Sequence, residues 1–392
     1  MNDKTDHEFL VSTSTDSDLG RAVEQVCREM RAFKSEPPEL AVVYISHHHA
    51  EGWDNLANEL VEKLKPKNLI GCSAESVVET MNELEEKPGF VVWCAWMKDA
   101  NLTPLRLGFE KTPDGGAIVG WPDELEQEWP SGAVMLLLAD PFTFPADYLL
   151  ERVNEDHAGA IVVGGMASGA SEPGANRVFY QNETLSDGAV GIMFDESARI
   201  KTIVSQGCRP IGDPLVITKA DRNMIEQLGG VSALQRLEAV FHELPTQEQL
   251  LVQRGLLVGR VMTEYQDQFE AGDFLIRNVL GVDREAGAIA IADYVRPGQT
   301  IQFHVRDELA AHRDLELLLR RQKKQMAAKA GLLFTCNGRG SRMFSEPSHD
   351  ASTIGAELGP VPLAGFFAQG EIGPIAGKNF LHGFTASLAL FH

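Results

Sequence analysis

Basic residues and long apolar runs are scarce in this sequence, and both shortages exclude classes of protein. The 392-residue chain has 35 Lys and Arg against 56 Asp and Glu, so its formal net charge is −21. Such a surface repels phosphate groups, and we therefore expect neither nucleic acid nor an anionic membrane as a partner. The longest apolar runs, such as 133–139, are far too short to span a bilayer. Residues 1–6 also lack the basic start and the apolar core of a secretory signal.

Cysteine is scarce as well, and its spacing favours a reducing compartment. The five cysteines are odd in number and form no CxxC motif. Secreted disulfide domains usually carry paired cysteines, so we expect a cytoplasmic protein. The sequence also lacks a P-loop, a kinase signature, a GxSxG motif and a basic helix-turn-helix. It therefore has no recognisable effector domain.

Three segments of the chain follow the same order, which predicts an internal repeat. Each begins with a buried strand (40–46, 134–138 and 332–335) and continues through roughly 25 to 30 residues to a turn that starts with glycine. Those glycines are Gly71, Gly164 and Gly365, and alanine follows three residues later each time. Such small residues allow close approach of the backbone, either to a neighbouring strand or to a ligand.

The region between the second and third repeats has a different pattern. Residues 224–243 have the spacing of an amphipathic helix, and short strands at 274–279, 288–295 and 300–305 predict an antiparallel meander. A long amphipathic helix is expected over 307–329. With 44% hydrophobic and 23% charged residues, the composition is that of a globular protein. We predict an α/β (α+β) fold of repeated strand–helix–strand units plus this meander, in two halves that share a central cleft.

Several separated motifs near the C-terminus resemble the FIST family. They are the Cys336-Asn-Gly-Arg339 segment, Glu346, the run from Gly365 to Pro374 and the pair Leu381-His382. One departure is Gly383, where the family usually has a polar residue. The resemblance covers most of the chain and implies three parts: an N-terminal extension (1–37), a FIST N-terminal-like domain (38–234) and a FIST C-terminal-like domain (235–392).

The resemblance implies a sensory function. FIST domains are ligand-binding modules of bacterial signalling proteins and of some F-box proteins, so we expect a cytoplasmic receptor that senses a small ligand and signals to a separate protein. A haem-based gas or redox sensor is an alternative, because relatives of this family are reported to have that role. The sequence has no CxxCH motif, which excludes covalent haem but not bound haem.

The strongest candidate site lies at the strand exits of the third repeat, because ligands bind off such ends in covered sheets. Its core is Cys336, Asn337, Arg339, Gly370 and Glu371. Arg339 would bind a carboxylate and Glu371 an amine, which together suit an amino-acid-like ligand. The alternative is a structural salt bridge between these two side chains. By resemblance alone, Glu346 and His382 join the site.

Cys336 also has three chemical interpretations. A nearby cation favours the thiolate, which binds a metal, a haem iron or an electrophile. With His382 as its base, it would serve an acyl- or amide-transfer enzyme, although the sequence favours a sensor without catalysis. The remaining interpretation is a buried, unreactive cysteine.

The first two repeats add further candidate lining residues. His47 begins a run of three histidines at a strand exit, and in an extended segment only the first and third share a side. Zinc needs about four ligands, and no second cluster stands nearby, so we expect no metal site. The turn residues Cys72, Ser73 and Ser168 are expected at the same rim. Asp140 either lines the pocket or caps the turn that follows it.

Overall fold

The computed structural model describes residues 7–113, 115–265, 269 and 271–392, and the chain forms two compact units. Unit 1 consists of Met1–Ser205, Leu315–Leu381 and Thr385–His392, and unit 2 consists of Gln206–Asp314 and His382–Phe384. Stretch 1–6, for which we expect no secretory signal, lies outside the described residues. Among the described residues, no helix has the length and apolar character needed to cross a membrane.

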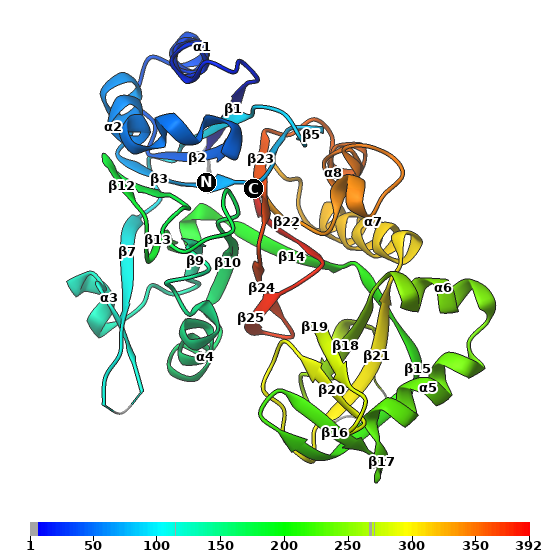
Figure 1. The fold of residues 1–392 in the computed structure, drawn as a ribbon. Helices are drawn as coiled ribbons and strands as arrows, with labels where there is room; N and C mark the ends of the chain where they lie inside the picture. Colours follow the sequence, from blue (N-terminus) through cyan, green and yellow to red (C-terminus); the bar gives the residue numbers. More distant parts are fainter. Residues whose placement is uncertain (1–6, 114, 266–268, 270) are drawn as a thin grey trace. The chain divides into compact units, whose positions relative to one another are not determined.

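Unit 1 repeats one motif three times (Figure 1). In each repeat, two parallel strands are joined through a helix, and a later strand returns antiparallel beside the first. The three sets are β2 (Leu40–Ser46), α2 (Trp53–Leu64), β3 (Asn68–Ala74) and β6 (Phe90–Trp96); β9 (Val134–Ala139), α4 (Ala146–Asp156), β10 (Ile161–Met166) and β13 (Ala189–Phe194); and β22 (Ala330–Cys336), α8 (His349–Leu358), β23 (Leu363–Ala368) and β26 (Thr385–Phe391). The expected mixed α/β fold with repeated strand–helix–strand units is confirmed.

The repeats exchange hairpins in a closed cycle. The hairpin of repeat 1, β4 (Val77–Glu79) and β5 (Asn82–Leu84), pairs with β23 of repeat 3. The hairpin of repeat 2, β11 (Val178–Tyr180) and β12 (Glu183–Leu185), pairs with β3 of repeat 1. Repeat 3 supplies β24 (Glu371–Ile375) and β25 (Lys378–His382), and β24 pairs with β10 of repeat 2. Each sheet of unit 1 therefore contains strands from two repeats.

The opposite edge of each sheet is closed by one further strand or hairpin. The edge strands are β1 (Glu8–Ser14) beside β6, β7 (Leu102–Glu110) with β8 (Ala117–Val119) beside β13, and β14 (Ile200–Gln206) beside β26. The remaining helices of this part are α1 (Leu19–Phe33), α3 (Asp123–Gln127), the portion of α7 (Glu308–Gln325) from Leu315 onward, and the 3₁₀ segments η1 (His47–Gly52), η2 (Glu196–Ala198) and η4 (Gly340–Arg342).

The strands of each repeat are apolar throughout because both of their faces are covered. In β2, Leu40, Val42 and Tyr44 face the inner core that all three sheets share. The alternate residues Ala41 and Val43 pack against α1 and α2 on the outer face. The corresponding outer faces pack against α4 and against α7 with α8. Continuous apolar runs were therefore a reliable signal for these strands.

The repeated glycines are explained by strand packing. A Cβ atom at Gly71, Gly164 or Gly365 would lie far inside van der Waals contact with a carbonyl oxygen of the neighbouring parallel strand. Those oxygens belong to Val43 and to its counterparts Leu137 and Leu333. Close approach to a neighbouring strand is therefore the role that the structure gives to all three glycines.

Unit 2 contains one large sheet with two helices packed against it. Its strands, in spatial order, are β15 (Cys208–Asp221), β21 (Thr300–Arg306), β18 (Leu256–Val261), β19 (Phe274–Asp283), β20 (Ala288–Ile291), β16 (Met224–Leu228) and β17 (Val231–Ser232). The helices are α5 (Ala233–Glu243) and α6 (Thr246–Arg254), and a 3₁₀ turn spans η3 (Ala271–Asp273).

Two expectations for unit 2 were wrong. The predicted helix over 224–243 is helical only from Ala233, because 224–228 form a strand that pairs with β15 and β20. Gly229 and Gly230 separate the two parts, since both have positive φ values (58° and 76°) that a helix does not allow. The meander is only partial: β19 and β20 form a hairpin, but β21 pairs with β15 and β18.

Candidate functional site

The turns that follow β3, β10 and β23 meet at one point, and Ser168 connects them. Its backbone N–H donates to the carbonyl of Ser73 (3.2 Å), and its hydroxyl accepts from the N–H of Glu75 (2.9 Å). The same hydroxyl donates to the carbonyl of Phe367. The N–H of Phe367 in turn donates to the carbonyl of Ser76 (3.0 Å). Residues that lie far apart in the sequence, such as Ser168 and Phe367 at 199 positions, thus form one hydrogen-bonded rim.

Beside this rim lies a buried ion pair between Arg339 and Asp350. The guanidinium donates through Nε and Nη2 to the two carboxylate oxygens, at 2.7 Å each, and both side chains are almost completely buried. Thr335 Oγ1 donates to the same carboxylate at 2.6 Å, and the Nδ1 atom of His349 lies 3.0 Å from it. Burial alone would raise the pKa of Asp350, but the charge and hydrogen bonds of Arg339 hold that pKa well below its usual range.

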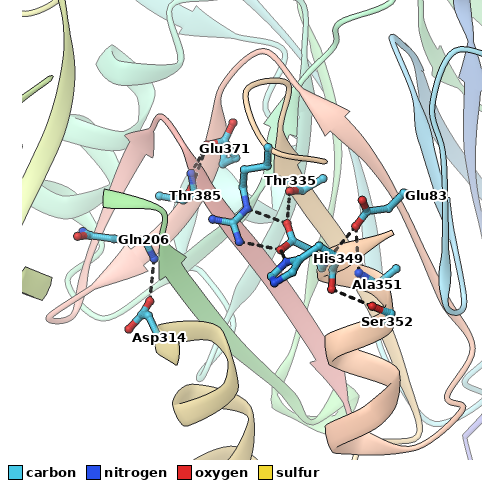
Figure 2. A network of polar contacts seen from close by, with 11 residues as sticks. Glu83, Gln206, Asp314, Thr335, His349, Ala351, Ser352, Glu371 and Thr385 are labelled. Atoms are coloured by element: carbon cyan, nitrogen blue, oxygen red, sulfur yellow. Dashed lines mark hydrogen bonds and ion pairs between the residues drawn. The ribbon is translucent and has the colours of Figure 1, made fainter. Parts of the chain in front are cut away.

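Glu83 joins this cluster from the exchanged hairpin of repeat 1 (Figure 2). Its Oε1 atom accepts from the backbone N–H groups of Asp350 (2.9 Å) and Ala351 (3.0 Å), in the first turn of α8. Its Oε2 atom is buried and has no hydrogen-bond partner among the described residues. Burial, together with the negative charge of Asp350, raises the pKa of Glu83 to about 8. At neutral pH we therefore expect a neutral carboxylic acid here.

Glu371 is a second carboxyl group of this kind. It is the first residue of β24 and is fully buried. Its Oε2 atom accepts from the N–H (3.1 Å) and the hydroxyl (2.9 Å) of Thr385, as Figure 2 shows. Its Oε1 atom has no hydrogen-bond partner among the described residues. Burial raises the pKa of Glu371 to about 8, although Thr385, Cys336 and the charge of Arg339 oppose that rise.

Cys336 and Asn337 complete the cluster at the exit of β22. Cys336 is half-buried, and its sulfur lies 3.4 Å from the donating N–H of Gly338. The N–H of Asn337 donates to the carbonyl of Ala368 at the end of β23 (3.0 Å). The side-chain Oδ1 atom of Asn337 is buried without a hydrogen-bond partner among the described residues. The cluster therefore combines one ion pair, two carboxyl groups with raised pKa values, a thiol and an amide.

Arg339 is engaged by a residue that neither sequence interpretation included. The sequence predicts either a ligand clamp of Arg339 and Glu371 or a salt bridge between them, whereas in the structure Arg339 forms an ion pair with Asp350. A ligand carboxylate would have to compete with that bidentate contact. The amide oxygen of Asn337 accepts hydrogen bonds, and the carboxyl groups accept them when ionised and also donate them when protonated, so the cluster suits a ligand with polar hydrogen-bonding groups.

Other candidates from the first two repeats have local structural contacts. Cys72 is fully buried in the inner core, and burial raises its pKa well above the usual value. The Ser73 hydroxyl accepts from the N–H of Arg177 (2.9 Å). Asp140 accepts from the backbone N–H (2.9 Å) and the hydroxyl (2.7 Å) of Thr143, so it caps the turn after β9.

The histidine run does not have the backbone that we expected. It begins the 3₁₀ segment η1 rather than continuing as an extended strand. His47 is exposed, and its Nδ1 atom lies 3.1 Å from the carbonyl of Glu75. His49 is buried, and neither of its ring nitrogens has a hydrogen-bond partner among the described residues. Burial lowers the pKa of His49, which keeps this ring neutral.

The three candidates that remain lie in different surroundings. The carbonyl of Gly370 accepts from the N–H of Met166 (2.8 Å) and so joins repeat 3 to repeat 2. Glu346 is exposed in the loop before α8. His382 is buried at the end of β25 and belongs to unit 2, whereas the polar cluster belongs to unit 1.

Sequence reasoning missed four polar members of the cluster: Glu83, Thr335, Asp350 and Thr385. Thr335 directly precedes Cys336, so its neighbourhood was visible in the sequence. Asp350 follows a serine and a histidine at the start of a helical pattern, which usually indicates a helix cap rather than a buried anion. Glu83 lies more than 250 positions earlier and reaches the cluster only through the exchanged hairpin. No local signal in the sequence predicts that exchange.

The side chains around Cys336 do not fit a haem pocket. An axial thiolate needs an apolar pocket large enough for the porphyrin. Cys336 instead lies close enough to the charged Arg339 and the buried carboxyl group of Glu371 to shift the pKa values of both, so its surroundings are polar. In the described part of the chain, no group of three or more His, Cys, Asp or Glu residues is placed to hold a metal ion. The arrangement is chemically suited to hydrogen bonding of a small polar molecule.

Comparison with known families gives a match over most of the chain. Residues 39–231 match the FIST N domain, and residues 233–374 match the FIST C domain. Glu83 comes from the first of these segments and the other members of the cluster come from positions in or just beyond the second. The polar cluster is therefore built from both segments, although it lies within one compact unit.

Two mycobacterial proteins are similar over nearly their full lengths. An uncharacterized protein of Mycobacterium tuberculosis (strain ATCC 25618 / H37Rv) is 43% identical over 385 residues, which cover 97% of this chain and 98% of that protein. An uncharacterized protein of Mycobacterium bovis (strain ATCC BAA-935 / AF2122/97) is 43% identical over 373 residues, which cover 94% and 95%.

Proposed function

Because this chain belongs to the FIST family of sensory domains, we propose that it is a cytoplasmic receptor that binds a small molecule and signals to a separate protein. Fold and family membership alone do not identify a ligand, so the proposal depends on the polar cluster of unit 1. We propose this cluster, with Arg339, Glu371 and Cys336 at its centre, as the ligand site.

The observation that carries the proposal is a set of three buried oxygens that have no hydrogen-bond partner in the described part of the chain. They are Oε2 of Glu83, Oε1 of Glu371 and Oδ1 of Asn337. An unsatisfied buried polar atom costs about 1–3 kcal/mol, so such atoms rarely accumulate without a reason. A ligand that supplies hydrogen bonds at these positions would recover part of that cost on binding.

The chemistry of the cluster favours a ligand with an amine or amide group. A buried carboxyl group binds an ammonium ion strongly once it ionises, and it donates or accepts a hydrogen bond when neutral. An amino-acid-like molecule fits if its amine contacts Glu371 and its carboxylate shares Arg339 with Asp350. The proposed role is binding without turnover.

Native mass spectrometry of the protein purified from its own host tests the site. We expect a retained small molecule in the wild-type spectrum and its loss in Glu371→Gln, which keeps the shape but removes the ionisable group. Glu346→Gln is the matched control because Glu346 is exposed in a nearby loop. Retention that is lost in the Glu346 variant but kept in the Glu371 variant would move the site to the loop and contradict the proposal.

Partner capture tests the signalling half of the proposal. Host extract is passed over immobilised protein with and without the released molecule, and the captured proteins are identified. A sensor that transmits a signal should bind a different set in the two states. Identical sets under both conditions would count against a signalling role.

A further inference from the structure

A separate cavity lies on the outer side of the β9–β10 sheet in unit 1. It has a volume of about 610 Å³ and is bounded by β8, α3, the segment after α3, and α4. Small-molecule sites usually have volumes of roughly 300–1,000 Å³, so the size is suitable. Its lining includes the aromatic and acidic side chains of Trp121, Glu126, Trp129, Tyr148, Asp156 and His157.

Aromatic rings form much of the wall, and their own contacts hold them in place. The centroids of Trp121 and Trp129 lie 5.6 Å apart with the ring planes tilted by 48°. His157 stacks on Trp129 at 3.9 Å with an interplanar angle of 10°. The Tyr148 hydroxyl donates to the carbonyl of Gly116 at 2.7 Å. These contacts fix the rings before any ligand arrives, which lowers the entropy cost of binding.

The charged groups at this cavity are predominantly acidic. Arg152 is the cation of the lining, and it is paired with Glu155 (3.1 Å) and Asp156 (2.6 Å). Glu126 also lines the cavity and has no cationic partner among the described residues. An anionic ligand would therefore meet a negative potential, whereas a cation would be attracted.

We propose that this cavity binds an organic cation with an apolar body, such as a quaternary ammonium compound. Aromatic faces attract cations through their quadrupole. Trp121, Trp129 and Tyr148 all line this cavity, and His157 covers one face of Trp129. Glu126 adds a carboxylate at the same cavity, and Leu125 and Leu149 supply apolar surface for the substituents. The proposal concerns a site other than the polar cluster and does not depend on it.

A pair of isosteric probes tests the charge requirement. Choline and 3,3-dimethylbutan-1-ol have almost the same shape, but only choline is charged. We expect choline to bind with saturable heat in isothermal titration calorimetry of the full chain, and the neutral alcohol to bind roughly tenfold more weakly. Equal affinities for the two probes, or saturable binding of neither, would overturn the proposal.

A matched pair of variants tests the site itself. Glu126→Gln should weaken choline binding roughly three- to tenfold because it removes the carboxylate at the cavity. Glu124→Gln on the same helix removes an exposed carboxylate that does not line the cavity, so it should leave the affinity unchanged. Trp121→Phe keeps an aromatic ring with a weaker cation attraction and should give an intermediate loss. Equal effects of the two glutamate variants would show that only the general charge of the surface matters and would refute the assigned site.

Discussion

Removing one partner of the buried Arg339–Asp350 pair should be far more harmful than removing both. In Arg339→Met, the carboxylate of Asp350 stays buried and loses its two hydrogen bonds of 2.7 Å from the guanidinium. Thr335 and His349 remain beside it, but the bidentate contact of the guanidinium is gone. Breaking a buried ion pair in this way typically costs about 3–5 kcal/mol of unfolding free energy. Protonation of Asp350 would relieve the cost, so we expect a smaller loss at pH 5 than at pH 8.

The double variant Arg339→Met/Asp350→Leu should recover much of that loss. It leaves no charge in the interior, and apolar replacements of buried pairs are often close to neutral. We therefore expect the double variant to be more stable than Arg339→Met by about 2 kcal/mol. The control is Arg106→Met, which breaks an exposed pair with Glu183 whose side chains are both 50% exposed. That change should cost less than about 1 kcal/mol.

Tryptophan fluorescence during urea unfolding is the appropriate assay. All five tryptophans lie in unit 1, so the signal reports on the unit that contains the ion pair. This choice avoids the mixed transitions that a protein with two compact units can show. If Arg339→Met costs no more than Arg106→Met, or if the double variant is less stable than the single one, our account of the pair as a buried charge interaction is wrong.

Three further predictions follow from the described residues. Glu83 and Glu371 have pKa values of about 8 in the folded state, above the ordinary value of 4.5. Their contribution to the free energy of unfolding is therefore complete below pH 4.5, where both groups are neutral, and it is lost as the pH rises through 8. The loss is about 5 kcal/mol per group, and Glu371→Gln should flatten the measured dependence of the urea midpoint between pH 5 and 9; an unchanged slope would contradict the burial argument. Gly365→Ala should destabilise unit 1 by about 2 kcal/mol or more through overpacking. The control Gly20→Ala, in the first turn of α1, should be neutral or slightly stabilising when both variants are compared by thermal unfolding. Similar melting temperatures for the two variants would refute the close-strand explanation. Iodoacetamide should label Cys336 first in the folded protein, because the other four cysteines are buried; peptide mapping that finds Cys336 labelled only after denaturation would show that its thiol is inaccessible.

Local patterns in the sequence were sufficient for the repeat but not for the connections between repeats. The strands of unit 1 are apolar on both faces, and the glycines at 71, 164 and 365 are required by neighbouring carbonyl groups. Both features depend on immediate surroundings, so a single sequence reveals them. The exchange of hairpins depends on which sheet edge is left unpaired. The packing of the whole unit determines that edge, so the local sequence does not reveal it. Residues 224–228 were misassigned because their apolar spacing fits a helix as well as a strand.

The candidate site likewise combines residues that local sequence patterns predict with residues that they do not. Cys336, Asn337, Arg339 and Glu371 stand at strand ends, where an abrupt change from apolar to polar residues is visible in the sequence. Asp350 and Glu83 reach the site from the start of a helix and from an exchanged hairpin. Their effect on the charge of the site was therefore invisible. The sequence suggested that Arg339 binds either a ligand or Glu371, whereas the structure pairs it with Asp350.

The cyclic hairpin exchange has a consequence for how this protein can be divided. The segment 39–231 includes β4 and β5, whose partner strand β23 lies in the other segment, and it includes β10, whose neighbour β24 also lies there. Expressed alone, this segment would leave β10 with an unpaired edge and the β4–β5 hairpin without a sheet, and such edges promote aggregation. The two halves recognised by sequence are thus mutually dependent for folding, and a truncation at their boundary would yield fragments that complement each other rather than independent modules.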